Sequence, residues 1–148
     1  MVQLLVLRGS RVLGIASPAN ADWLRSHGAV PVPYGNGLAE HLRAAAGEGI
    51  DGFIDLFGPE YVELAVDLGI PRDRIETIAS FEKAQELGVK AEGSATASTP
   101  EILTEMAGLV ASGAIELPIA ATYPLDRVAD AFAELELRHT RGKIVLIP

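Results

Sequence analysis

Few side chains in this chain have the type and spacing that acid–base, nucleophilic or metal chemistry requires. His27, His41 and His139 have no serine, cysteine or carboxylate partner at a spacing typical of a catalytic pair. The chain contains no cysteine, which excludes disulfide bonds and thiolate metal sites. Asp55, within FIDLFG, could act as a base, but its neighbours favour a structural residue of a strand. The sequence therefore predicts neither a nucleophile–base pair nor a metal centre.

The order of the elements is a clearer signal. Short apolar segments alternate with helical stretches, which is typical of a parallel sheet covered by helices. The segments expected to be strands are Arg11–Ser17, Val30–Tyr34, Gly52–Gly58, Arg74–Phe81 and Lys143–Ile147. Met1–Leu7 fits either a short buried strand or a helix with Val2, Leu5 and Val6 on one face. The predicted fold class is α/β, a Rossmann-like parallel sheet with helices on both faces.

Sheets of this kind bind nucleotides at the carboxyl ends of their strands, next to a glycine-rich phosphate loop. No such loop stands before the first predicted unit, so the sheet is expected to lack its first strand. The usual place of that strand is central, between Arg11–Ser17 and Gly52–Leu56. The unpaired backbone groups of those two strands could be satisfied in three ways. Met1–Leu7 could become a strand, a neighbouring chain could donate one, or the two strands could pair directly.

Composition narrows the classes of partner. The chain has 148 residues, 49% of them hydrophobic, which is enough for one domain with a packed core. Its formal net charge of −8 argues against nucleic acid or an anionic membrane as the main partner. No apolar run approaches the roughly 20 residues of a membrane span. A soluble cytoplasmic protein is expected.

The order of several segments resembles a known family. RGSRVLGIAS, LRSHGAVPVPYG, GIDGFIDLFG, RIETIASF and RGKIVLIP are similar to segments of the zinc-independent, quinone oxidoreductase-like branch of the medium-chain dehydrogenase/reductase family. The likeness covers nearly the whole chain and the second half of those enzymes. It implies that residues 1–148 are a partial NADP-binding Rossmann-type domain, without the glycine-rich loop and the N-terminal catalytic domain. Met1–Leu7 would then be the end of the helix that follows that loop.

The resemblance also implies which coenzyme is bound. Ser17 ends the strand at which NAD-specific sites commonly carry an Asp or Glu for the ribose hydroxyl. Because Ile15, Ala16 and Ser17 include no acid, NADP is favoured over NAD. Many relatives carry a lysine where this chain has Asn20, so its affinity for the phosphate is expected to be weaker. The alternative role for Ser17 and Asn20 is an ordinary helix cap.

The other implied cofactor contacts follow later strands. They are Tyr34 beside the adenosine phosphate, Leu56, Phe57 and Gly58 along a ribose, and Ile78 and Ala79 near the nicotinamide. The glycine permits close approach of the backbone to a ligand. Ordinary roles are the alternatives here: a strand-end tyrosine, a plain strand-to-helix turn, and core packing.

The sequence therefore favours the cofactor-binding portion of an NADPH-dependent quinone or enone oxidoreductase. Alone, the chain is expected to bind NADPH weakly, to be inactive and to form a homo-oligomer, for which we favour a dimer. The competing hypothesis is a non-catalytic truncated domain that self-associates. A methyltransferase-like nucleotide binder is disfavoured, because it would also need a glycine-rich loop and a following acid.

Overall fold

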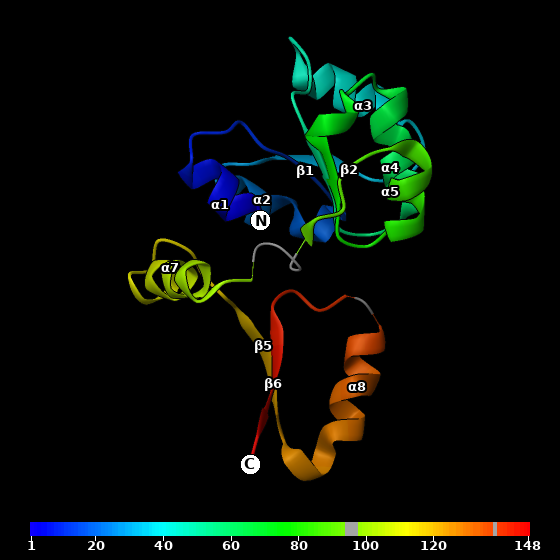
Figure 1. The fold of residues 1–148 in the computed structure, drawn as a ribbon. Coiled ribbons are helices and arrows are strands. Elements are labelled where there is room, and N and C mark those ends of the chain that lie inside the picture. The colour runs from blue at the N-terminus through cyan, green and yellow to red at the C-terminus, as the bar shows by residue number, and fades with distance from the viewer. Residues whose placement is uncertain (94–97, 138) are drawn as a thin grey trace. The chain divides into compact units, whose positions relative to one another are not determined.

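Parallel strand pairs joined by helices make up the structure, a computed structural model that describes residues 1–93, 98–137 and 139–148 (Figure 1). The chain divides into two units, Met1–Ile102 and Leu103–Pro148. The three pairs are β1–β2, β3–β4 and β5–β6, and all are parallel. The predicted α/β class, with parallel strands flanked by helices, is therefore confirmed. That all 148 residues act as one cofactor-binding domain stays a prediction.

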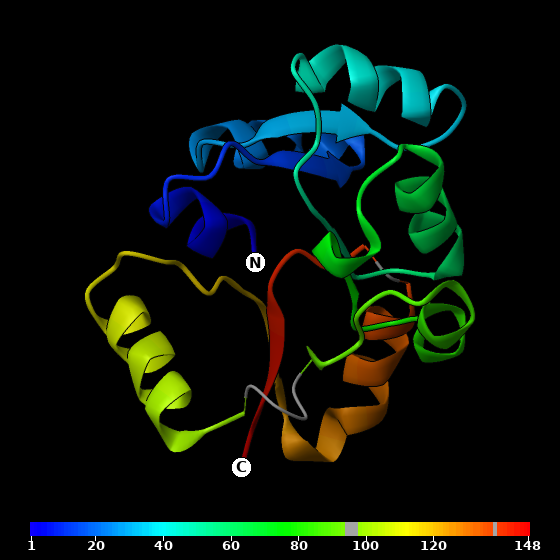
Figure 2. The ribbon, with the colours of Figure 1, turned by 45° about the horizontal axis from the view of Figure 1, so that its top comes forward.

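The first strand pair lies between helices. Figures 1 and 2 show α3 on one side of the pair and α1 and α2 on the other. The elements are α1 (Val2–Leu7), β1 (Leu13–Ala16), η1 (Pro18–Asn20), α2 (Ala21–Ser26), β2 (Val30–Pro33) and α3 (Leu38–Ala46). Met1–Leu7, which the sequence left open, is thus helical after its first residue. Gly37 and Gly47 flank α3 at its two ends, a boundary signal that the sequence alone carries.

Small residues let α2 and α1 approach this strand pair closely. A Cβ atom added at Gly14 of β1 would lie 2.8 Å from a methyl carbon of Leu24, so the buried Leu24 side chain would have to shift to admit it. Leu24 is buried together with Val12 and Ala29, and Val2, Leu5 and Val6 of α1 pack against this cluster. The apolar face predicted for Met1–Leu7 as a helix is therefore the face that α1, partly buried, packs against this cluster.

The second strand pair carries the best-packed core of the first unit. Its elements are β3 (Phe53–Asp55), α4 (Pro59–Asp67), η2 (Arg72–Arg74), β4 (Ile75–Thr77) and α5 (Phe81–Leu87). The core consists of Val62 and Ala65 of α4 with Ile70 and Ile75, all buried. Lys83 of α5 joins the two helices, because its ammonium lies 2.8 Å from Glu63 and 2.7 Å from Glu86. Hydrogen bonds to these two carboxylates raise the pKa of Lys83 to about 12.

The two strand pairs of the first unit do not join into one sheet in the described residues. In a parallel strand, alternate residues direct their backbone N–H and C=O groups to opposite sides. Since Val30 N donates to Val12 O at 2.8 Å, Leu13 and Ile15 direct theirs away from β2. Likewise Ile78 N donates to Asp55 O, so Ile54 directs its groups away from β4. The direct pairing considered from the sequence is therefore absent from the described chain, and the helical α1 does not fill the gap as a strand.

The prolines of β2 match its place at an edge. β2 pairs with β1 in the register Gly14 to Pro31 and Ala16 to Pro33. Proline lacks the N–H that a ladder needs, and both prolines stand where the alternation turns the backbone away from β1. In the described residues β2 pairs with β1 alone, so it lies at an edge of its sheet, where its prolines interrupt no ladder.

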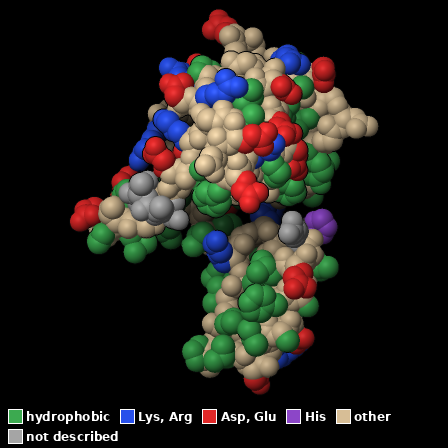
Figure 3. Space-filling model, turned by 45° about the vertical axis from the view of Figure 1, so that its right-hand side comes forward, with side chains coloured by type: hydrophobic (Ala, Val, Ile, Leu, Met, Phe, Trp, Pro, Cys, Tyr) green, Lys and Arg blue, Asp and Glu red, His purple; other side chains and the backbone are tan. Residues whose placement is uncertain are grey.

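The second unit is built on the remaining strand pair. Its elements are α7 (Pro100–Ala111), which begins in the first unit, β5 (Ile119–Pro124), η3 (Leu125–Arg127), α8 (Val128–Glu136) and β6 (Lys143–Ile147). The Tyr123 hydroxyl donates to Glu134 Oε2 at 2.5 Å and so holds α8 to β5. Ala131 is the buried residue of α8, whereas Leu125 and Phe132 are more than half exposed. Apolar side chains are visible on the face of this unit that Figure 3 presents.

Among the described residues, no helix combines the length and the apolar character that crossing a membrane would require.

Candidate functional site

The predicted site residues stand directly after parallel strands. β1 and β2 pair Ala16 with Pro33, so the next residues, Ser17 and Tyr34, leave their strands at the same level. β3 and β4 pair Asp55 with Thr77, so Leu56 and Ile78 do the same. Parallel pairing therefore groups the predicted residues as Ser17 with Tyr34, and as the turn Leu56–Gly58 with the turn Ile78–Ala79.

Ser17 and Asn20 interact with each other rather than with a helix end. Ser17 precedes η1 in an extended conformation, and Asn20 precedes α2. Neither side chain makes a capping hydrogen bond to the helix it precedes. Instead the Asn20 amide donates to Ser17 Oγ at 3.3 Å. The helix-cap alternative therefore receives no support from the geometry, and the end of β1 presents two neutral polar groups.

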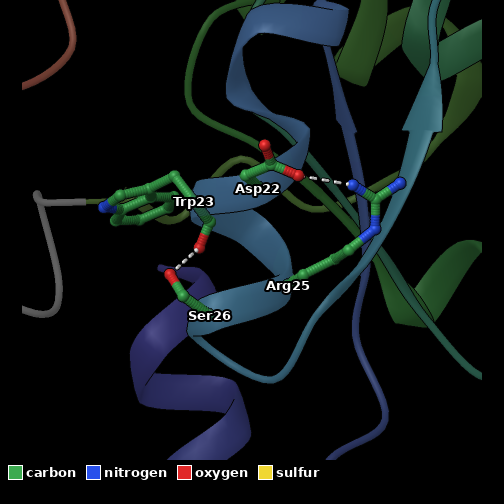
Figure 4. A network of polar contacts seen from close by, with 4 residues as sticks. All are labelled: Asp22, Trp23, Arg25 and Ser26. Atoms are coloured by element: carbon green, nitrogen blue, oxygen red, sulfur yellow. Dashed lines mark hydrogen bonds and ion pairs between the residues drawn. The ribbon is translucent and has the colours of Figure 1, made fainter.

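The first acid after β1 already has a cationic partner. Asp22 lies in the first turn of α2, and its carboxylate is 2.8 Å from the guanidinium of Arg25 (Figure 4). Both side chains are largely exposed. On the same helix the Ser26 hydroxyl donates to the Trp23 carbonyl oxygen at 2.8 Å (Figure 4). Ile15, Ala16 and Ser17 themselves contribute no charge to the end of β1.

Arg11, the cation nearest in sequence to β1, also has partners elsewhere. Its guanidinium donates to the carbonyl oxygens of Ala45 and Ala46 at 2.5 and 2.9 Å. These carbonyls end α3, where the helix dipole favours a positive charge. At the end of β1 a ligand phosphate would therefore meet the neutral donors of Ser17 and Asn20, whereas Arg11, which precedes the strand, is bound to the end of α3.

Aromatic side chains stand after β2 and β3. Tyr34 is 56% exposed and Phe57 is 68% exposed. Phe57 meets the ring of Tyr61 edge to face, with centroids 5.6 Å apart. Partial burial raises the pKa of Tyr61, and Glu60, Tyr34 and Asp55 add smaller electrostatic contributions in the same direction. Tyr34 therefore lies near enough to Tyr61 to influence its ionisation.

A buried carboxylate organises the turn after β3. Asp55 is 1% exposed, and its Oδ1 accepts hydrogen bonds from Phe57 N at 2.8 Å and Gly58 N at 3.0 Å. Its Oδ2 accepts from the hydroxyls of Thr77 at 2.6 Å and Ser80 at 3.1 Å. A carboxylate with four donors and no access to solvent is unsuited to act as a general base. The geometry supports the structural role predicted for Asp55.

Thr77 organises the turn after β4 in the same manner. Its Oγ1 accepts from Ala79 N at 3.1 Å and from Ser80 N at 3.0 Å, while the hydroxyl donates to Asp55. The backbone of both turns is thus drawn inward, and the side chains of Leu56, Phe57 and Ile78 are left half or more exposed.

Reasoning from the sequence did not identify Thr77 and Ser80 as site residues. The signal that could have found them is a repeated offset. Asp55 is followed three residues later by Gly58, and Thr77 is followed three residues later by Ser80. Asp and Thr side chains commonly accept hydrogen bonds from backbone N–H groups two and three residues further on. Such a pair at the ends of adjacent strands predicts two ordered turns.

One stretch of the chain matches the sequence pattern of a dinucleotide-binding loop but does not lie between a strand and a helix. Gly47, Gly49 and Gly52 form a G-x-G-x-x-G pattern. The dinucleotide loop runs from a strand into a helix, but this stretch runs from the end of α3 to the start of β3. It therefore lies before the amino end of β3, away from the carboxyl ends that carry the candidate site.

The comparisons with known proteins place this geometry in a family. A family described as zinc-binding dehydrogenase matches residues 28–146. No group of three or more metal-binding side chains gathers anywhere in the described residues, and the chain has no cysteine, so they do not fit a zinc centre. A search of curated proteins found no match.

Solved structures share the fold. The quinone oxidoreductase of Coxiella burnetii is 24% identical with a TM-score of 0.75, and the match covers 98% of this chain and 47% of that one. The quinone oxidoreductase of Pseudomonas syringae pathovar tomato is 20% identical with a TM-score of 0.79, and the match covers 99% of this chain and 52% of that one. A mycobacterial protein solved in complex with NADPH is 21% identical with a TM-score of 0.77, and the match again covers 99% of this chain and 52% of that one. This chain therefore spans about half the length of the solved structures it matches.

The hydrogen bonds of Thr77 generate a stability prediction. Thr77→Val keeps the shape of the side chain, but it leaves the buried amide of Ser80 and the partly buried amide of Ala79 without their acceptor, and Asp55 without one donor. We expect a loss of about 2 kcal/mol in the free energy of unfolding, measured by urea titration with circular dichroism. Thr122→Val, at an exposed position of β5, is the matched control and should change stability by less than about 0.5 kcal/mol. Equal stability of the two variants would contradict the assignment.

Proposed function

Because the chain belongs to the zinc-binding dehydrogenase family, we propose that it supplies part of the nicotinamide-cofactor site of an NADPH-dependent quinone or enone oxidoreductase. The observation that carries the proposal is the grouping of Ser17, Tyr34, Leu56 and Ile78 directly after parallel strands, where this class of sheet binds nucleotides. The cofactor supplies the hydride chemistry, and these residues orient it.

The two strand pairs take different parts of the cofactor in this proposal. Ser17, Asn20 and Tyr34, after β1 and β2, contact the adenosine phosphate through hydroxyl and amide donors. The turn Leu56–Gly58 passes a ribose, and Ile78 with Ala79 borders the nicotinamide. The exposure of Leu56 and Ile78, 52% and 50%, supports a role on a surface that a ligand can cover.

The end of β1 favours NADPH over NADH. A ribose 2′-phosphate meets no carboxylate at Ile15, Ala16 or Ser17, and Asp22 is paired with Arg25. Asn20 donates hydrogen bonds without adding a charge, and the chain as a whole carries a net charge of −8. The preference therefore rests on the absence of repulsion at this strand end, and we expect weak binding by the chain alone.

A substitution at Ser17 tests the coenzyme preference. Ser17→Asp places a carboxylate where it repels a 2′-phosphate and accepts the ribose hydroxyl. Titration by calorimetry or NMR should show the ratio of NADPH to NADH affinity falling about tenfold or more, which corresponds to about 1.4 kcal/mol. Ser17→Asn, which introduces a side chain of the same size as aspartate but without its charge, should keep the wild-type ratio. A wild-type protein that prefers NADH would contradict the proposal.

An activity measurement tests the role of the chain alone. The described residues contain no proton donor or nucleophile arranged for catalysis, so we expect no enone or quinone reduction by the purified 148-residue chain. NADPH oxidation should match the rate without protein, while an intact quinone oxidoreductase serves as the positive control. Protein-dependent oxidation that a point substitution in this chain abolishes would refute this expectation.

Self-association is the competing role of the chain. β1 and β3 each carry an edge whose backbone groups have no strand partner in the described residues, and such edges pair readily with another chain. We expect a homodimer, detected as a concentration-dependent mass in light scattering. A stable monomer at the highest attainable concentration would exclude strand donation between copies. Dimerisation without any binding of NADPH would favour the non-catalytic alternative.

A further inference from the structure

The turns after β3 and β4 share one buried anchor. The turn after β3 is held by Asp55 Oδ1, and the turn after β4 is held by Thr77 Oγ1. The two anchors are joined, because Thr77 and Ser80 both donate their hydroxyls to Asp55 Oδ2. Asp55 is 1% exposed, Thr77 0% and Ser80 6%. Water is therefore a poor substitute for any partner that is removed.

An asparagine in place of Asp55 cannot keep these hydrogen bonds. Thr77 Oγ1 already accepts two backbone N–H groups, which uses both of its lone pairs. Its single proton must therefore go to an acceptor, and Asp55 Oδ2 is that acceptor at 2.6 Å. An asparagine amide in place of Oδ2 would present a second donor to a hydroxyl that has no acceptor capacity left. In the opposite orientation the amide would face the N–H groups of Phe57 and Gly58, which are also donors, so both atoms at this position must be acceptors.

The network holds in place the residues that the cofactor proposal needs. Phe57 and Gly58 donate their backbone N–H groups to Asp55 Oδ1, and Leu56 lies between Asp55 and Phe57 in the sequence. Ala79 donates its N–H to Thr77 Oγ1, and Ile78 is held by its N–H to the carbonyl oxygen of Asp55 at 3.1 Å. Both turns are therefore tied to one hydrogen-bonded cluster of Asp55, Thr77 and Ser80.

We propose that Asp55 is a positioning residue whose buried carboxylate, through Thr77 and Ser80, fixes the turns after β3 and β4 as one unit that presents Leu56–Gly58 and Ile78–Ala79 to the ribose and nicotinamide of the cofactor. The inference rests on the proposed function for the identity of the ligand. The coupling of the two turns is a property of the free protein and is measurable without any ligand.

Amide hydrogen exchange of the free 148-residue chain, resolved by NMR, tests the coupling. Ser80→Ala removes one donor to Asp55 in the turn after β4. We expect exchange to become about tenfold faster at Phe57 and Gly58 as well as at Ala79, although the substitution lies 22 residues or more from the first two in sequence. Asp55→Asn should give the same pattern more strongly. Faster exchange confined to the turn that carries the substitution would overturn the inference.

A matched serine variant controls for the loss of a hydroxyl. Ser26→Ala removes an exposed hydroxyl whose two partners, the Trp23 carbonyl oxygen (Figure 4) and His27 Nδ1, lie at the same end of α2 and outside the network. It should leave exchange at both turns unchanged. Val62→Ala, in the apolar core of the same strand pair, lowers the stability of that unit without removing a hydrogen bond of the network.

Addition of NADPH at millimolar concentration tests the positioning role. In the wild type we expect chemical-shift changes at both turns, and in Ser80→Ala about tenfold weaker binding. Val62→Ala should bind as the wild type does, because it alters stability and not the turns. An affinity loss of equal size in Val62→Ala would overturn the positioning role. No shifts in the wild type, with exchange still coupled, would overturn the proposed function and leave the coupling established.

Discussion

Parallel strand pairing is the constraint on which the remaining features of this chain depend. Two parallel neighbours cannot be joined by a tight turn, so each pair requires a crossover, and here α2, α4 and α8 lie in the crossovers. Parallel pairing also sends the carboxyl ends of both strands to one edge. That is why residues far apart in sequence, such as Asp55 and Thr77, stand opposite each other in the register.

The buried Asp55 shows how the strand ends are turned into defined loops. A charge without solvent costs several kcal/mol unless donors replace the water it has lost. Four donors surround Asp55, two from backbone amides and two from hydroxyls. The same bonds that satisfy the carboxylate determine where the backbone turns, and so which side chains are exposed. The hydrogen bonds that stabilise the buried carboxylate are therefore the same bonds that shape the two turns.

β1 and β3 each have one edge without a strand partner in the described residues. The usual strand order of a Rossmann sheet has one more strand between the equivalents of these two. In the described residues β1 pairs with β2 and β3 with β4, and no backbone ladder crosses from one pair to the other. Each pair instead carries its own apolar core, around Leu24 in one case and around Val62 and Ile75 in the other. These separate cores explain how each pair can hold its helices without a continuous sheet.

The sequence by itself determined the α/β class and the alternation of strands with helices after the first segment, because apolar patterns, glycines and prolines act locally. The helix at Leu38–Ala46 and the edge position of the proline-bearing β2 were predictable for this reason, as was the structural character of Asp55. Tertiary structure decided that Met1–Leu7 is a helix, since Val2, Leu5 and Val6 bury their side chains against Leu24 and its neighbours. It also decided that Asp55 meets Thr77 and Ser80. Those outcomes depend on strand register and on contacts between residues as far as 25 positions apart, which local patterns do not encode.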